Sequence, residues 1–384
     1  MIKQGVIALI AGLAATPVWA ELRPDYQIHG FAAQGFVLTK GNNLFGDSLD
    51  GSFDLREMGL NSQWQPLTNL GISGQLLSRR AGAADDGEPR VDFLFADLAL
   101  QRMATDGHEL GLRLGRVKNP FGLFNETRDV VFARPSILLP QSIYYDGEGL
   151  RSLLFSVDGL QGYGQFDHGA HFTQVTFNYA LNFTLSQDEK RELFGGASPP
   201  GDVRISRYSV TRVMTDWQAG VFRTAMTLLT ARLDLALQGA PPQMFDASIA
   251  VFSARWNRAR LSLFGEYSLV TFSGDTTTRS DGGYLQTEYR FTPGLTGFAR
   301  VGARFLDRND RDGSAFARAT GQPAHTRYSR SLATGLRWQF DSHWGISGEW
   351  HAINGSGTVP ALDNQHRDRA SPWNALLIMA GYRF

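Results

Sequence analysis

The sequence predicts an all-β fold: a transmembrane antiparallel up-and-down β-barrel of about sixteen strands. Three observations predict it. Apolar and polar residues alternate along the chain from residue 26 onward, the links between these segments are long and short in turn, and the chain ends in an alternating segment that finishes on Phe384. No run of about eighteen apolar residues follows the N-terminal segment, so only strands could cross a membrane.

The alternation is clearest in two neighbouring segments near the C-terminus, 335–340 and 345–352. One face of the first carries Leu336, Trp338 and Phe340, and its other face carries Gly335, Arg337 and Gln339. The second opposes Ile346, Trp350 and Ala352 to Ser347, Glu349 and His351. A strand that is apolar on one face and charged on the other suits lipid outside and water inside a barrel, although a soluble sandwich would also alternate.

Sixteen segments of roughly ten residues, the length that a tilted strand needs to cross a bilayer, have this character. The first eight lie near 26–38, 53–64, 69–79, 90–102, 108–118, 156–167, 171–183 and 203–214. The second eight lie near 218–231, 245–257, 259–272, 282–291, 295–306, 327–340, 343–353 and 373–384.

The links between these segments predict how the barrel is oriented. Every second link is short: 65–68, 103–107, 168–170, 215–217, near 258, 292–294 and 341–342. The others are longer and polar: 39–52, 80–89, 119–155, 184–202, 232–244, 273–281, 307–326 and 354–372. Long extracellular loops and short periplasmic turns are typical of outer-membrane barrels. Closure is expected because lipid offers no partner to the backbone groups of an open sheet edge.

The N-terminal residues and the composition set the cellular compartment. Residues 1–20 contain Lys3, the apolar run 5–15 and a Val-Trp-Ala end, as a cleaved secretory signal peptide does. We therefore expect one domain over residues 21–384, exported through the periplasm to the outer membrane. Without Lys3 the chain has 36 basic and 37 acidic residues, which gives no indication of nucleic-acid binding. There is no cysteine, so no disulfide framework is expected.

Aromatic residues support a membrane location. The final segment places Leu376, Ile378, Ala380, Tyr382 and Phe384 on one face. Beside the short links lie Trp64, Trp217, Trp256, Phe291, Phe340 and Trp344. Aromatic rings concentrate at membrane interfaces, although packing at strand ends would also place them there.

The faces predicted to point inward carry both signs of charge. The basic members are Arg113, Arg223, Arg255, Arg300, Arg304 and Arg337; the acidic members are Glu57, Asp97, Glu266, Glu288 and Glu349. Such faces predict a water-filled lumen, and opposed charges can sort solutes. Any strand face that contacts water carries charged residues, so these residues alone do not establish ion selectivity.

The third long link, 119–155, is too long and too apolar for a free loop. Prolines stiffen it, and its apolar residues could pack on the inner wall while its charges face the channel. The residues expected at this constriction are Arg116, Lys118, Glu126, Arg128, Asp129 and Arg134. A lid, or a loop packed against a neighbouring subunit, is the alternative.

Residues 116–122 (Arg-Val-Lys-Asn-Pro-Phe-Gly), with Thr127-Arg-Asp and Arg134-Pro-Ser-Ile, resemble the phosphate-selective-porin-type barrels of Gram-negative bacteria and their uncharacterised relatives. The resemblance implies a sixteen-stranded, trimeric, passive porin for small hydrophilic solutes or ions. The final segment also resembles the closing strand that the barrel assembly machinery reads, with Tyr382 and Phe384 as the signal. The lysine cluster of the phosphate-selective members is missing here, so phosphate specificity does not follow. Lipid and lipopolysaccharide are the other expected partners.

Other functions find little support in the sequence. There is no Gly-x-Ser-x-Gly elbow and no His-Glu-x-x-His motif, although a lipase-like barrel enzyme or a non-conducting adhesin stays open. The segment 307–313 resembles a calcium loop but lacks the acidic residue that should close it. We expect no cofactor, metal or catalytic residue, and at most weak charge selectivity.

Overall fold

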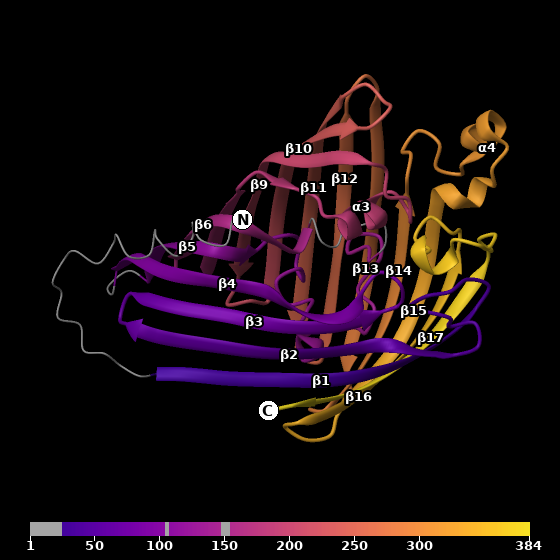
Figure 1. The fold of residues 1–384 in the computed structure, drawn as a ribbon. Coiled ribbons are helices and arrows are strands. Elements are labelled where there is room, and N and C mark those ends of the chain that lie inside the picture. The colour runs from indigo at the N-terminus through magenta and orange to yellow at the C-terminus, as the bar shows by residue number, and fades with distance from the viewer. Residues whose placement is uncertain (1–24, 104–106, 147–153) are drawn as a thin grey trace.

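The computed structural model describes residues 25–103, 107–146 and 154–384, so the predicted signal peptide lies outside the described residues. The strands form one antiparallel sheet that closes into a barrel because β1 pairs with β17 (Figure 1). The sheet has seventeen strands, of which β8 (Phe183–Thr184) only continues β7 along β9. The predicted fold of sixteen membrane-length strands is therefore confirmed.

The strands follow one another around the barrel in chain order. The first seven are β1 (Asp25–Lys40), β2 (Ser52–Leu67), β3 (Leu70–Ala81), β4 (Asp86–Met103), β5 (His108–Lys118), β6 (Ser156–Asp167) and β7 (His171–Ala180). After β8 come β9 (Gly201–Trp217), β10 (Phe222–Leu237), β11 (Gln243–Arg258), β12 (Leu261–Ser273), β13 (Thr277–Arg290), β14 (Leu295–Phe305), β15 (Tyr328–Gln339), β16 (Trp344–Asn354) and β17 (Trp373–Arg383).

Short helical segments lie in the loops. They are η2 (Val131–Ala133), α3 (Gln187–Leu193), α4 (Ser314–Thr320), η3 (Ala324–Arg327) and η4 (Leu362–Asn364). Within the described residues, no helix has both the length and the apolar character that a membrane crossing requires.

Three links are shorter than the sequence predicted. The connections β3–β4, β10–β11 and β12–β13 span only 82–85, 238–242 and 274–276. Their strands continue as hairpins beyond the apolar band, with pairs such as Leu235 with Gln243 and Ser273 with Thr277. Backbone pairing does not depend on side-chain polarity, so polar residues expected in loops extend the ladders instead.

The outer face of the barrel is apolar. Leu336, Trp338 and Trp350 are exposed there, while Glu349 and His351 point inward and are buried. At the short-turn end, Trp64, Trp217, Phe291, Phe340 and Trp344 are among the exposed aromatic residues, and Trp256 is half-buried. The alternation thus places lipid-compatible residues outside along the described strands.

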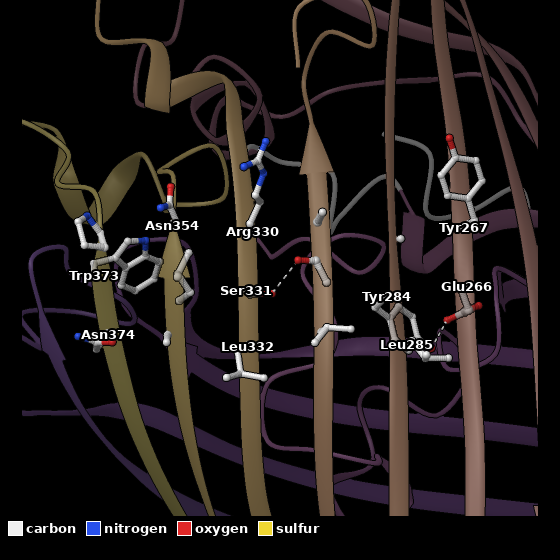
Figure 2. Close-up of a pocket in the computed structure, with 17 residues that line it drawn as sticks. Glu266, Tyr267, Tyr284, Leu285, Arg330, Ser331, Leu332, Asn354, Trp373 and Asn374 are labelled. Carbon is white, nitrogen blue, oxygen red and sulfur yellow. Dashed lines mark hydrogen bonds between the residues drawn. The ribbon is translucent and has the colours of Figure 1, made fainter. Parts of the chain in front are cut away.

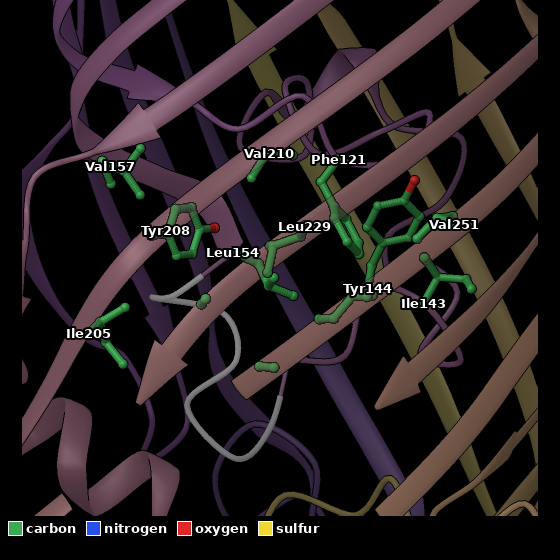
Figure 3. Packing of buried hydrophobic residues seen from close by; sticks show 14 of the residues in the cluster. Phe121, Ile143, Tyr144, Leu154, Val157, Ile205, Tyr208, Val210, Leu229 and Val251 are labelled. Atoms are coloured by element: carbon green, nitrogen blue, oxygen red, sulfur yellow. The ribbon is translucent and has the colours of Figure 1, made fainter. Parts of the chain in front are cut away.

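The interior departs from a simple water-filled tube, because two apolar clusters occupy its long-loop half. One joins residues of the third loop, such as Phe121 and Tyr144, to the inner faces of β9–β11 (Figure 3). The other joins Leu44 and Phe45 of loop 41–51 to inner residues such as Leu377 of β17. At these two clusters the strands are apolar on the inner face as well as on the outer face. This is the pattern of a strand that is covered on both faces.

Asp363 ties together three loops at the long-loop end. Its Oδ1 accepts the N–H of Ala83 (2.8 Å) and its Oδ2 accepts the N–H of Phe45 (3.1 Å). Asn364 adds a reciprocal pair of hydrogen bonds to the backbone of Asn43, each 2.9 Å long. Burial raises the pKa of Asp363, whereas these backbone N–H donors lower it.

We expect Asp363→Ala to destabilise the loops by about 1–3 kcal/mol, because the N–H groups of Ala83 and Phe45 lose a charged acceptor. Limited proteolysis of the folded protein should then cut the loops faster. Asp368→Ala, an exposed carboxylate in the same loop, is the matched control and should leave the cutting rate unchanged. Equal rates for both variants would show that Asp363 does not hold the loops.

Candidate functional site: a lumen crossed by the third loop

Every residue predicted to line the lumen lies on the inner face of its strand. Several of these residues have exposed apolar sequence neighbours on the outer face, such as Met58 beside Glu57 and Val301 beside Arg300. The set comprises Arg113, Arg223, Arg255, Arg300, Arg304, Arg337, Glu57, Asp97, Glu266, Glu288 and Glu349. Alternation alone was therefore sufficient to assign these side chains to the interior.

Charges in the short-turn half of the lumen form a partly exposed vestibule. Arg113 pairs with Asp97 (2.9 Å) and Arg223 pairs with Asp216 (2.7 Å). On the opposite wall Arg337 pairs with Glu288 (3.2 Å). We call these six residues the short-turn vestibule. Because each cation has an acidic partner beside it, the fixed charges largely cancel.

Two inward arginines stand apart from these pairs. The guanidinium of Arg255 lies 5.3 Å from the ring centre of Phe264, and its Nε donates to Asn257 Oδ1 (3.0 Å). Arg304 lies 5.1 Å from the ring centre of Tyr145 in the long-loop half. Both contacts are cation–π interactions.

The third loop crosses the lumen from one wall to the other. Arg134 pairs with Glu57 of β2 (2.9 Å), while the N–H of Leu123 donates to Glu266 of β12 (2.9 Å). Strands β2 and β12 lie far apart in the closed ring. Since both ends of this span are bonded, the third loop crosses the lumen between β2 and β12, and we call this crossing segment the septum.

Further hydrogen bonds pin the middle of the loop to β14 and β16. Arg300 donates to Ser136 Oγ and to the carbonyl of Leu138, both at 2.9 Å. The carboxylate of Glu349 accepts the N–H groups of Ile137 and Leu138. Both wall residues are buried, so neutral polar groups of the loop replace water as hydrogen-bond partners of their charges.

Glu266 is the hydrogen-bonding centre on the far wall. Its carboxylate accepts from the hydroxyls of Tyr144, Tyr284 and Ser253, each at 2.7 Å, besides the N–H of Leu123. Tyr144 belongs to the loop, and its hydroxyl in turn accepts the N–H of Leu123 (2.8 Å). One buried carboxylate thereby joins three strands to the loop.

We expect Glu266→Ala to destabilise the protein by about 2–3 kcal/mol, because buried hydroxyl and N–H donors lose their acceptor. Urea unfolding of the protein in lipid vesicles measures this change. Tyr284→Phe removes a single donor from the same carboxylate and should cost only about 1 kcal/mol. Two variants with equal unfolding midpoints would contradict a central role of the carboxylate.

Four of the charges expected to face the channel are instead buried. Lys118 Nζ contacts Asp92 of β4 (2.6 Å) and Asp129 (2.7 Å), and all three side chains are nearly inaccessible. Arg128 pairs with Asp146 (2.8 Å), and Arg134 is enclosed against Glu57. Lys118 and Arg134 hold the loop to the wall, and the pair of Arg128 with Asp146 joins two parts of the loop. Any influence of these residues on permeating ions would act through the position of the loop.

Arg116 and Glu126 occupy different places. Arg116 pairs across the sheet with Leu94, an exposed residue of the outer face, and its guanidinium lies 3.5 Å from Asp158. The structure thus moves Arg116 from the lumen to the outer surface, as strict alternation from Arg113 requires. Glu126 is partly exposed inside the lumen and pairs with Arg212 of β9.

Sequence reasoning missed several members of the buried network. Arg79 contacts Glu57 (3.5 Å) and Asp85 (3.1 Å), and all three are buried. Asp92 and Arg212 complete the contacts to the loop. Alternation places Arg79 and Arg212 inside, but the acids that pair with the loop come from distant parts of the chain.

The chain end closes the barrel. The backbone of Phe384 exchanges two hydrogen bonds with Gly30 of β1, at 3.0 and 3.1 Å. Phe384 is exposed on the outer face, and the rings of Tyr382 and Trp344 lie 4.9 Å apart. Recognition of Tyr382 and Phe384 by an assembly machinery stays a prediction.

Candidate metal ligands and one His–Ser contact can be located among the described residues. No group of three or more His, Asp or Glu side chains among them could hold a metal ion. Asp307, Asp310 and Asp312, in the segment that resembles a calcium loop, accept backbone N–H groups of their own loop. The contact of His325 Nδ1 with Ser356 Oγ (3.0 Å) involves a fully buried hydroxyl.

Solved structures share this fold. The outer membrane channel DcaP of Acinetobacter baumannii matches with a TM-score of 0.59 at 12% identity, covering 94% of this chain and 97% of that one. OmpF of Salmonella typhi, in complex with daunomycin, matches with a TM-score of 0.58 at 12% identity, covering 94% and 98%. An OmpT structure from Vibrio cholerae in trimer form scores 0.56 at 10% identity, covering 94% and 99%.

No protein-family model and no curated protein matches the sequence. At these low identities the structural likeness shows the fold alone. The chain has the barrel fold of outer-membrane porins and channels, and its role is a separate question.

Proposed function

We propose that this protein is an outer-membrane porin: a narrow, passive channel for small hydrophilic solutes or ions. The observation that carries the proposal is the third loop, which is bonded to opposite walls of a closed barrel and separates a charged vestibule from the long-loop end. The fold shared with DcaP and OmpF supports it. The resemblance to phosphate-selective-type porins supports the channel and not the phosphate specificity.

The septum argues for a low conductance. Lys118, Arg128 and Arg134, which a wide pore would expose, are buried in the contact between loop and wall. A pore narrowed by such a loop passes only small solutes, since access is set by its tightest ring of side chains. The paired charges of the short-turn vestibule argue for weak selectivity.

Recording from planar lipid bilayers tests the proposal. The purified protein should give small, stable, ohmic conductance steps, and the reversal potential in a salt gradient should lie near zero. Absence of steps in both the wild-type protein and a variant with a shortened third loop would overturn the channel. Absence in the wild type alone would identify a barrel that the loop closes.

Residence in the outer membrane and a trimeric assembly belong to the same proposal. The exposed apolar band and aromatic residues support a membrane location, and one structural neighbour is a trimer form. A heat-labile oligomer on a native gel is expected, and a strict monomer at all concentrations would remove the trimer. Contacts with lipopolysaccharide and the barrel assembly machinery are further parts of this proposal.

A lipase-like enzyme finds less support. Ser356 is fully buried beside His325, so a substrate could not reach the hydroxyl without a change of structure. We propose that the protein is not an enzyme. Hydrolysis of a lipid ester by the purified protein would contradict this.

A further inference from the structure

The outer wall of the barrel contains a groove of about 800 Å³ near the long-loop end. It lies across β12–β16 and reaches the start of β17 (Figure 2). This volume is within the range of known ligand sites, about 300–1,000 Å³. The groove is outside the lumen, so an inference about it rests on the proposed outer-membrane location and not on conduction through the channel.

Cross-strand pairing explains why the wall is hollow here. Gly283, Ala303 and Arg330 are direct neighbours on adjacent strands, and their row is flanked by Tyr267 and Asn354. Two small residues between large ones leave a depression in the outer surface.

The next row, away from the loops, is apolar. It consists of Leu285, Val301, Leu332 and Ala352, of which the first three are 50%, 53% and 48% exposed. A hydrocarbon chain could lie against this row and extend into the hollow above it.

Arginines surround the loop-side end of the groove. Arg311 pairs with the buried Asp281 and stacks 4.7 Å from the ring centre of Phe305. Arg330, which lines the groove, is exposed, lies 5.8 Å from the same ring centre and has no ion pair among the described residues. Arg279 and Arg308 are exposed nearby, with their backbones joined by a hydrogen bond of 2.7 Å.

The acids of this region are engaged elsewhere. Asp281 is buried under the aromatic ring and accepts from Tyr267 as well as Arg311. Asp307 accepts the N–H of Asn309, and Asp310 accepts N–H groups at the start of α4. Four arginines are exposed beside the groove (Arg279, Arg308, Arg311 and Arg330) against two exposed acids (Asp275 and Asp312), so the exposed charge there is net positive.

We propose that this groove binds a phosphorylated lipid of the leaflet at the long-loop end, with an acyl chain on Leu285, Val301 and Leu332 and its phosphate against Arg330 and Arg311. Guanidinium groups bind phosphate through charge-assisted hydrogen bonds. Along the barrel wall the apolar row comes first, then the hollow, and then the arginines nearest the loops. This order matches that of acyl chain and headgroup from the middle of a bilayer to its surface.

Native mass spectrometry of the detergent-purified full chain tests the site, with bis-phosphorylated lipid A as the probe and phosphatidylcholine as the uncharged comparison. The wild type should retain one lipid A per chain in preference to phosphatidylcholine. Arg330→Gln should weaken lipid A binding about tenfold, as expected for one lost charge-assisted contact. Ala303→Leu should fill the hollow and lower binding as much.

Two matched controls lie on the outer face away from the groove. Arg204→Gln removes an exposed arginine at the long-loop end of β9, and Ala236→Leu enlarges an exposed alanine at the long-loop end of β10. Both should bind lipid A as the wild type does. Equal binding by all variants, or equal retention of phosphatidylcholine, would overturn the site. So would a dimer or trimer that dissociates in Ala303→Leu, because the groove would then hold another copy of the chain.

Discussion

Replacing residues 120–153 with a short Gly/Ser linker is expected to raise the single-channel conductance several-fold. The third loop is the structure that crosses the lumen, bonded to β2 on one side and to β12 on the other. Its two ends are adjacent, since Lys118 pairs with Ser156 across the sheet, so a short linker can join them. Without the loop, water would solvate Glu57 and Glu266. The sixteen strands could still pair into a complete ring, so the barrel itself would persist.

A second loop provides the matched control. The segment 308–325 contains α4, which Figure 1 shows beyond the end of the barrel, and it also begins and ends at adjacent positions because Leu306 bonds to Arg327 (2.9 Å). Its replacement by the same linker should leave the conductance as in the wild type. Planar bilayer recordings measure the single-channel conductance of the wild type and of the two loop replacements. Equal conductance for all three proteins would mean that the third loop is not the barrier to flow.

The barrel could be predicted from the sequence because alternation is a local property. Leu336 and Arg337 are neighbours in the chain and must face opposite sides of a strand, whatever the rest of the protein does. The same rule placed Glu266 and Arg300 inside correctly. It also places Arg116 outside, three residues after the inward Arg113, whereas the resemblance of residues 116–122 to a porin loop favours the channel.

The filling of the lumen could not be predicted in the same way. Inner residues such as Val251 and Leu377 are apolar because loop residues cover them, and those loop residues lie far away in the chain. The pairing of Lys118 with Asp92 and Asp129 likewise depends on how the loop folds back over β4. The sequence contains one indication that loops fill the lumen. The final strand is apolar on both faces at Leu376 and Leu377, which indicates that both of its faces are shielded from water.

Lys118→Met is expected to have the largest effect on stability of any single substitution considered. Methionine has a similar length and no charge, so Asp92 and Asp129 would be left buried without their shared cation. Breaking a buried ion pair on one side costs about 3–5 kcal/mol. The same loss releases the loop at its start, so the open-channel current should also become noisier.

Arg116→Met is the matched control, two residues earlier on the same strand. Arg116 lies on the outer surface beside the exposed Asp158, and a solvent-exposed ion pair contributes about 0–1 kcal/mol. Urea unfolding in lipid vesicles should therefore separate the two variants clearly, with the control near the wild type. If Lys118→Met unfolded at the urea concentration of the control, the buried network would not be what holds the third loop against the wall.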